Sequence, residues 1–201
     1  MIDTGIDETH AEFIGKIHAA SVDIYDGTHG FDPASVGSTP RNHLDDEDGH
    51  GTGVASAAAA AKLPDDDPLL AGPGPAGMHG VAFDSTILAI RADDNDPACN
   101  PTPGCDFESP AVVAAIDYAV DRGANIINLS LGSDSGVVAG IHAAIDRAIR
   151  QGIDICSPAS ITCLSVRSSS GVSIVRSRPL SSFTACSSKT IVSVMREIRS
   201  N

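Results

Sequence analysis

The sequence contains 201 residues, with 26 acidic and 13 basic side chains and a formal net charge of −13. A chain of this length is sufficient for one domain, since domains usually contain roughly 100–200 residues. The acidic charge argues against binding to nucleic acid or to an anionic membrane, because both need a cationic surface. No apolar stretch approaches about 18 residues, so no membrane span is predicted. The residues that follow Met1 also lack the pattern of a signal peptide.

The net charge is divided unevenly along the chain. Residues 1–155 contain 25 acids and seven bases, a formal charge of −18, whereas residues 156–201 contain one acid and six bases, a charge of +5. Serine rises from nine residues in the first segment to 14 in the second. So abrupt a change is typical of a tail with different physical properties, or of a segment that does not continue the natural gene. We therefore expect residues 156–201 to be a divergent Ser/Arg-rich tail, disordered or out of frame.

The first segment alternates between helical and extended patterns. Its expected elements are a helix over Gly53–Lys62, a strand within Val81–Ile90, a helix over Ala111–Arg122, a strand over Asn125–Leu131, a helix over Val137–Gln151 and a strand from Ile153 to Ile155. Ser109 is expected to cap the second helix, with Pro110 as its first residue. This alternation predicts an α/β fold: a mostly parallel sheet with helices on both faces.

Three short segments carry residues suited to chemistry. Asp3 follows an apolar residue and precedes a glycine turn, and His50 stands between two glycines at the start of the Ala-rich segment. Ser130 lies in Asn128–Gly132, at the end of an expected strand. The order is acid, histidine and serine. In that arrangement a buried carboxylate fixes the histidine tautomer, and the histidine deprotonates a serine hydroxyl.

These segments resemble the subtilisin-like serine peptidases, the subtilases. Ile2–Asp7 and His50–Ser56 are similar to the family's segments around its catalytic aspartate and histidine, which implies these roles for Asp3 and His50. Gly80–Arg91 resembles the family's preceding strand. Asn128–Gly132 resembles the strand that pairs with an extended substrate, so the resemblance implies a substrate edge formed by Ser130, Leu131 and Gly132.

The resemblance covers nearly all of residues 1–155 and implies a partial subtilase catalytic domain. It implies serine endopeptidase activity on a polypeptide substrate, and a parent protein that is secreted, periplasmic or at the cell surface. It also allows structural calcium, although no calcium-ligand pattern is matched residue by residue, and no cofactor is predicted. The oligomeric state is not indicated by any pattern in the sequence.

The sequence departs from the family pattern at three places. Where a Ser-Ala-Gly-Asn segment should supply an oxyanion donor, the chain has Cys156–Ser160. No Gly-Thr-Ser-x-Ala run is present, and Ser181–Ala185 and Ser187–Ser188 do not match it, so no nucleophile is identified. Only two residues precede Asp3. We therefore expect this chain to be inactive as a peptidase, and we interpret it as a subtilase gene interrupted near codon 156.

Other interpretations of the same residues remain open. Asp3-Thr4-Gly5 is also a signature of aspartic peptidases, although that class needs a β-rich chain and either a second such triplet or a dimer. Alternatively, Asp3 would only cap a turn. Ser130 as a nucleophile is less favoured than packing or a substrate edge, because no strained turn into a helix follows it. For the chain as a whole, two alternatives to an inactive subtilase fragment are a non-catalytic, peptide-binding pseudopeptidase and an unfolded, non-functional translation product.

Two further groups of residues each have both a functional and a purely structural interpretation. A metal cluster would use the imidazoles and carboxylates of one loop, whose members are His43, Asp45, Asp46, Asp48 and His50. Such a run of charge is more commonly a solvated loop. Cys99 and Cys105 are separated by a Pro-rich loop that permits a disulfide, while unpaired thiols fit the sequence nearly as well.

Overall fold

The computed structural model describes residues 1–25, 44–64, 79–94, 106–132 and 139–157. In chain order its elements are β1 (Ile2–Asp3), the short 3₁₀ helix η1 (Ala11–Phe13), β2 (Val22–Asp23), α1 (His50–Ala59), β3 (Ile90–Arg91), α2 (Ser109–Asp121), β4 (Ile126–Asn128), α3 (Ala139–Arg150) and β5 (Asp154–Cys156). Several predictions lie outside the described residues: the tail from residue 158 onward, the Cys99–Cys105 pair, and His43 of the suggested metal cluster.

Every strand pair in the described residues is parallel. Strand β3 lies between β1 and β2, with Ile90 opposite Ile2 and Val22, and β4 pairs with β5. A parallel bridge between Ile2 and Leu129 connects β1 to the residue that follows β4. The spatial order is therefore β2-β3-β1-β4-β5, which confirms the predicted parallel sheet. Parallel strands end at the same edge, so Asp3 and Ser130 lie at the same edge of this sheet.

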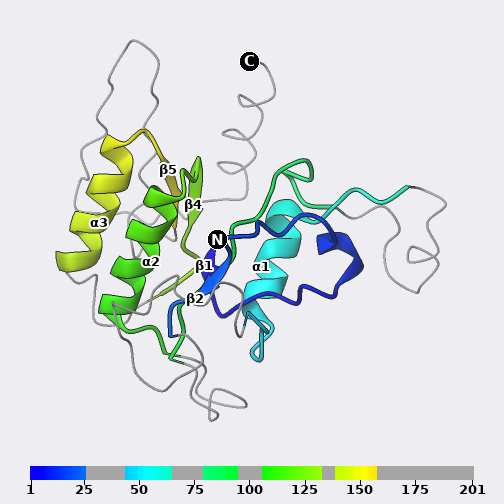
Figure 1. The fold of residues 1–201 in the computed structure, drawn as a ribbon, viewed down its shortest axis with the longest axis horizontal. Helices are drawn as coiled ribbons and strands as arrows, with labels where there is room; N and C mark the ends of the chain where they lie inside the picture. Colours follow the sequence, from blue (N-terminus) through cyan, green and yellow to red (C-terminus); the bar gives the residue numbers. More distant parts are fainter. Residues whose placement is uncertain (26–43, 65–78, 95–105, 133–138, 158–201) are drawn as a thin grey trace, which may run out of the picture.

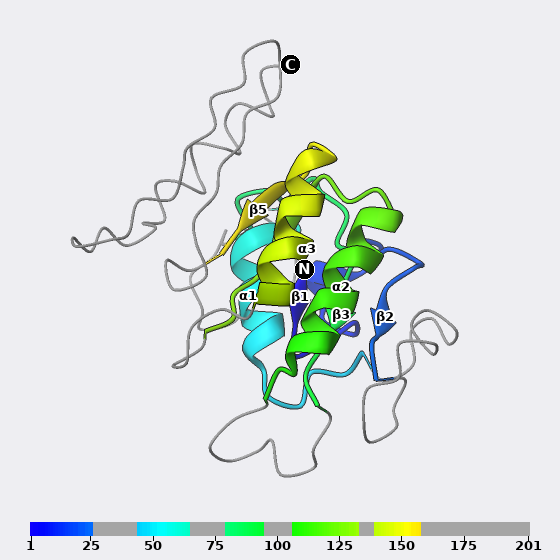
Figure 2. The ribbon, with the colours of Figure 1, turned by 90° about the vertical axis from the view of Figure 1, so that its left-hand side faces the viewer.

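Helices cover both faces of the sheet. Helix α1 lies on one side of the strands, and α2 and α3 lie side by side on the other, as two perpendicular views show (Figures 1 and 2). This confirms the predicted arrangement of helices on both faces of the sheet. Among the described residues, no helix is both long enough and apolar enough to cross a membrane.

The core is divided into two clusters, one on each face. Consecutive residues of a strand point to opposite faces of a sheet. Ile90 therefore packs in the cluster that includes α2 and α3, while the preceding Ala89 packs in the cluster that includes α1. Helix α1 contributes Ala55 and Ala59, whose small side chains let the helix approach the sheet closely. The Ala-rich composition that favours a helix here also fits the space available.

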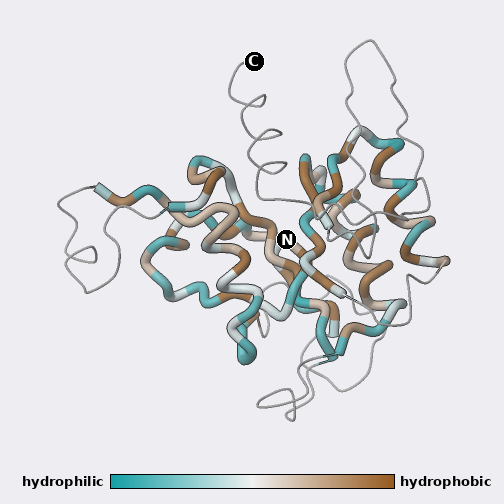
Figure 3. The backbone as a smooth tube through the Cα atoms, turned by 180° about the vertical axis from the view of Figure 1, so that it is seen from behind, coloured by the Kyte–Doolittle hydropathy of each residue, from teal (hydrophilic) through white to brown (hydrophobic). Residues whose placement is uncertain are grey.

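Helices α2 and α3 pack against each other and the sheet through their apolar sides. The turns of α3 alternate between hydrophobic and hydrophilic residues (Figure 3), with Ala144, Ile145 and Ala148 buried.

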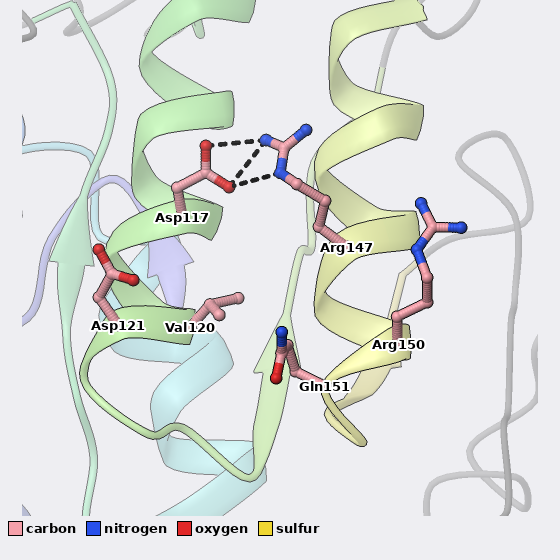
Figure 4. A pocket seen from close by; sticks show the side chains of 6 residues that line it. All are labelled: Asp117, Val120, Asp121, Arg147, Arg150 and Gln151. Carbon is pink, nitrogen blue, oxygen red and sulfur yellow. Dashed lines mark hydrogen bonds and ion pairs between the residues drawn. The ribbon is translucent and has the colours of Figure 1, made fainter.

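On the outer side of the two helices, Arg147 binds both carboxylate oxygens of Asp117 at 2.8 Å beside an open hollow of about 450 Å³ (Figure 4). Both side chains are nearly half exposed, so this pair contributes at most about 1 kcal/mol.

Several predicted boundaries were wrong. Strand β4 contains Ile126–Asn128 rather than Asn125–Leu131, and three further elements differ. Strand β3 contains only Ile90–Arg91, because the chain at Val81 and Ala82 turns back and donates its N–H groups to carbonyls of α1. Helix α2 begins at Ser109 rather than after it, and its N-cap is Glu108, without a side-chain cap bond. Helix α1 is His50–Ala59 instead of Gly53–Lys62, because the N–H of Ala61 is drawn away to the carbonyl of Glu12.

Candidate active site

Strand β1 ends in a buried carboxylate. Asp3 is 1% exposed, and its Oδ1 accepts a hydrogen bond from the backbone N–H of Thr4 at 2.9 Å. The chain then turns at Gly5, whose φ of 124° is a conformation that L side chains rarely adopt. A Cβ at Gly5 would also lie 2.5 Å from the carbonyl oxygen of Leu44. Glycine is thus required directly after the acid.

Helix α1 brings a histidine to this carboxylate. His50 is the first residue of the helix, and the following Gly51 packs directly on the end of β1. A Cβ at Gly51 would lie 2.2 Å from the carbonyl oxygen of Gly5 and 3.2 Å from Cβ of Asp3. The glycine after the histidine therefore permits the close approach that places the two functional side chains side by side.

His50 and Asp3 form a hydrogen bond between Nδ1 and Oδ1 at 2.7 Å. Because a carboxylate only accepts, the imidazole carries a proton on Nδ1, and Nε2 is left to act as a base. The hydrogen bond to Asp3 raises the pKa of His50; partial burial opposes this rise, and the charges of Asp3, Asp48 and Asp46 add to it. The imidazole is 46% exposed, so it remains accessible from solvent.

The second oxygen of Asp3 is buried without a hydrogen-bond partner among the described residues. The hydrogen bonds to this carboxylate in the described structure are all accepted by Oδ1, from Thr4 and from His50. A buried acceptor without a donor is unfavourable by about 1–3 kcal/mol, and a catalytic role is one of the few reasons for which a native structure keeps such a group. This asymmetry favours a chemical role for Asp3 over the alternative in which it only caps a turn.

The Asp3–His50 contact is expected to make stability depend on pH. Because the pKa of His50 is higher in the folded state than its ordinary value of 6.5, its stabilising effect is complete below that value and is lost as pH rises through the raised pKa. Urea denaturation between about pH 5 and pH 9 should therefore show a loss of stability that His50→Gln removes. His142→Gln, a change of an exposed histidine on α3, should retain it. An unchanged profile in His50→Gln would contradict the assignment.

The acidic loop before α1 is used for hydrogen bonding within the fold. Asp46 accepts bonds from Thr4, Gly49 and Thr52, and Asp48 accepts from the backbone N–H of His50. Within the part of the chain that the structure describes, no group of three or more His, Cys, Asp or Glu residues is placed to hold a metal ion. The described members of the suggested metal cluster are therefore not arranged as one, and Asp46, which is half-buried, is not simply part of a solvated loop.

The predicted substrate edge lies in the same sheet. Leu131 is buried, whereas Gly132 is exposed and has open space where a side chain would be. The hydroxyl of Ser130 accepts a hydrogen bond from Asn128 at 3.0 Å. Among the described residues, no hydrogen bond joins Ser130 to His50, and the segment does not turn into a helix directly after Ser130. This geometry gives no support to Ser130 as a nucleophile.

Sequence reasoning missed a buried charged network beside the site. Arg91 is 3% exposed and pairs with Asp93, which is fully buried, through Nε and Nη2 at 2.7 and 3.1 Å. Its Nη1 donates to the carbonyl of Asp45 at 2.8 Å, so the network also holds the acidic loop. The available signal was the position of Arg91 immediately after an apolar run, with two acids following it.

Comparison with known families settles the ancestry of this site. The model of the subtilase family matches residues 1–178. The chain belongs to the subtilase family. The match continues past the change in composition after residue 155, and it leaves the aspartic-peptidase alternative without support, because the partner of Asp3 is a histidine.

Alignments with individual subtilases span most of this chain but less than half of each subtilase. Thermitase from Thermoactinomyces vulgaris is 32% identical over 152 residues, which are 76% of this chain and 43% of thermitase. A thermophilic serine proteinase from Bacillus sp. (strain AK1) is 34% identical over 67% of this chain and 25% of its own. Among solved structures, the nisin leader peptidase NisP from Lactococcus lactis aligns over 78% of this chain and 41% of its own, with a TM-score of 0.52 and 23% identity. That similarity supports the fold alone.

Proposed function

We propose that this chain carries the acid–histidine part of a serine endopeptidase centre. Asp3 holds the imidazole of His50 through Nδ1, and Nε2 acts as the general base that takes the proton of an attacking serine hydroxyl and later returns it to the leaving amine. The observation that supports these roles is the 2.7 Å hydrogen bond between a buried carboxylate and a half-exposed imidazole in a subtilase chain.

The peptide substrate is proposed to lie along Ser130, Leu131 and Gly132. An extended peptide adds to a sheet through backbone hydrogen bonds, which requires unobstructed access to the strand. The open space beside Gly132 supports this assignment, as does the position of the segment at the sheet edge where Asp3 lies. The same features support a second candidate function, binding of peptides without cleavage, since they need no nucleophile.

The proposed centre lacks its nucleophile within these 201 residues. No Gly-Thr-Ser-x-Ala or Ser-Ala-Gly-Asn segment is present in the sequence. In subtilisin, loss of the serine lowers kcat on the order of 10⁶-fold, and loss of the oxyanion donor about 10²- to 10³-fold. We therefore propose that the chain by itself does not hydrolyse peptides, and that residues 156–201 result from a frame change. Translation of the other two frames after codon 155 should then reveal both segments; finding neither would contradict the frame change.

A fluorophosphonate probe distinguishes the catalytic proposal from the inactive one. Such probes label an activated serine, so the purified chain should remain unlabelled while an intact subtilase labels under the same conditions. Labelling that His50→Ala abolishes would show that a nucleophile is present and would overturn the proposed inactivity. Peptide binding is measured separately, by the change in amide signals near Gly132 on titration with an unstructured peptide; no change would remove the second candidate.

The location of the parent protein is proposed from its relatives. One relative that is 30% identical over 66% of this chain is a cell wall-associated protease of Bacillus subtilis (strain 168). A parent protein that acts outside the cell on polypeptides agrees with this name.

A further inference from the structure

The carboxylate of Asp46 connects the end of β1 with the beginning of α1. Its Oδ1 accepts hydrogen bonds from Oγ1 of Thr4 at 2.7 Å and from the N–H of Gly49 at 2.9 Å. Its Oδ2 accepts from the N–H of Thr52 at 2.7 Å. Partial burial on its own would raise the pKa of Asp46, but the hydrogen bonds from Thr52, Thr4 and Gly49 together outweigh it and lower the pKa. A carboxylate with several donors is held in one orientation.

Asp46 also determines where the hydroxyl proton of Thr4 points. The hydroxyl of Thr4 accepts the N–H of Gly51 at 2.9 Å and has a single proton to donate. Two acceptors are available: Oδ1 of Asp46 at 2.7 Å and Oδ1 of Asp3 at 3.5 Å. The shorter contact directs the proton to Asp46. Oδ1 of Asp3 therefore accepts from His50 without competition from this hydroxyl.

The same residues complete the N-terminus of α1. The first N–H groups of a helix have no partner within it, and the N-cap Gly49 has no side chain to accept them. They are instead accepted by residues outside the helix: that of His50 by Asp48, that of Gly51 by Thr4, and that of Thr52 by Asp46. Thr4 and Asp46 thereby attach the first turn of α1, which carries His50, to the strand that carries Asp3.

We propose that Asp46 is a positioning residue that, through Thr4 and the first turn of α1, holds His50 against Asp3. The inference rests on the proposed function of that pair and assigns Asp46 a part in it. Asp46 acts only through other residues: it hydrogen-bonds neither Asp3 nor the imidazole of His50 in the described structure. A carboxylate at the N-terminus of a helix is also favoured by the helix dipole, which adds stability but does not orient the imidazole.

Two variants of the acidic loop separate position from charge. Asp46→Asn keeps the shape of the side chain but replaces one of its two accepting oxygens by an NH₂ group. Because an NH₂ group only donates, it cannot accept the hydrogen bonds that this oxygen accepts. Asp48→Asn removes the same charge, and the charge of Asp48 raises the pKa of His50 more than that of Asp46 does. If charge alone acted, Asp48→Asn would lower the pKa of His50 at least as much as Asp46→Asn. We expect the larger fall in Asp46→Asn.

The measurement is the titration of the His50 ring by NMR in the full chain, assigned with His50→Gln. The low-field Nδ1–H signal of the hydrogen bond to Asp3 should be retained in Asp48→Asn and weakened in Asp46→Asn. Equal falls in pKa with both signals retained would overturn the proposal. Circular dichroism shows whether each variant is folded. If Asp46→Asn is not folded, Thr4→Ser and Thr4→Val provide the test, because serine keeps the hydroxyl that links Asp46 to Gly51 and valine does not. The serine variant should preserve the Nδ1–H signal of His50, and the valine variant should weaken it. Equal signals in the two variants would contradict the positioning role of Asp46.

This readout does not depend on a nucleophile. A failure of the positioning role leaves the fluorophosphonate result unchanged, and the His50 titration is measured on chain that has not been treated with the probe. The two proposals therefore fail in different experiments.

Discussion

Arg91→Met is expected to lower the free energy of unfolding by about 3–5 kcal/mol, because removal of one partner leaves buried charge without compensation. The methionine fills a similar volume, so the loss reflects charge more than packing. Arg91 is the register partner of Asp3 on one neighbouring strand and of Asp23 on the other, and all three are almost fully buried. Chemical denaturation of the variant and the parent chain at neutral pH measures the difference.

The loss should also depend on pH in a defined direction. Burial raises the pKa of Asp93, and Arg91 is the nearby charge that opposes this rise. Without Arg91 the pKa should rise further, so the buried carboxyl stays protonated while the unfolded chain ionises. Because an acid with a raised folded-state pKa favours unfolding above its ordinary pKa of 3.8, the variant should be more strongly destabilised at pH 8 than at about pH 5.

A double variant provides the control. Arg91→Met combined with Asp93→Asn removes the bidentate pair as a whole, which is less harmful than leaving one charged partner in place. It should therefore recover part of the stability lost by Arg91→Met and most of its pH dependence. A double variant no more stable than the single one would show that Asp93 is not the group left uncompensated.

The arrangement of Asp3 and His50 was accessible from sequence because their motifs report local requirements. Gly5 is required by a turn with positive φ, and Gly51 by the close approach of α1 to the end of β1, so each glycine next to a functional residue marks a place where a side chain would not fit. Each motif thus records the geometry of its own neighbourhood. The parallel sheet was equally predictable, since its apolar runs alternate with helical periods at short spacing.

The supporting contacts were not accessible because they join residues far apart in the chain. The start of α1 at His50 depends on Thr4, which lies 47 residues before Gly51 and accepts its N–H. From sequence alone, Asp46 is one acid among several in a charged loop, and nothing local distinguishes it from Asp48. Similarly, the apolar residues near Val81 have strand-like composition, but their N–H groups bind the end of α1. Propensity was overridden by tertiary contacts in both cases.

The first turn of α1 offers a matched test of how tightly the site is packed. Gly51→Ala would place a Cβ 2.2 Å from the carbonyl oxygen of Gly5, and backbone on both sides leaves little room to move. Overpacking of this kind costs about 1–3 kcal/mol and occasionally more, and we expect the upper end of that range. Because the displaced turn carries His50 away from Asp3, the pKa of His50 should fall toward its ordinary value of 6.5.

Gly53→Ala is the control, two residues along the same helix. A Cβ at Gly53 meets no atom within 4 Å, and the residue is exposed inside α1. Since glycine within a helix is less favourable than alanine by about 0.5–1 kcal/mol, this change should stabilise the chain by about that amount and leave the His50 titration unchanged. If Gly51→Ala lowers the free energy of unfolding and Gly53→Ala raises it, then contact with β1, and not helix propensity, determines which residue this turn accepts at position 51. If Gly51→Ala were also stabilising, the close approach of α1 to Asp3 could not be the reason for a glycine after His50.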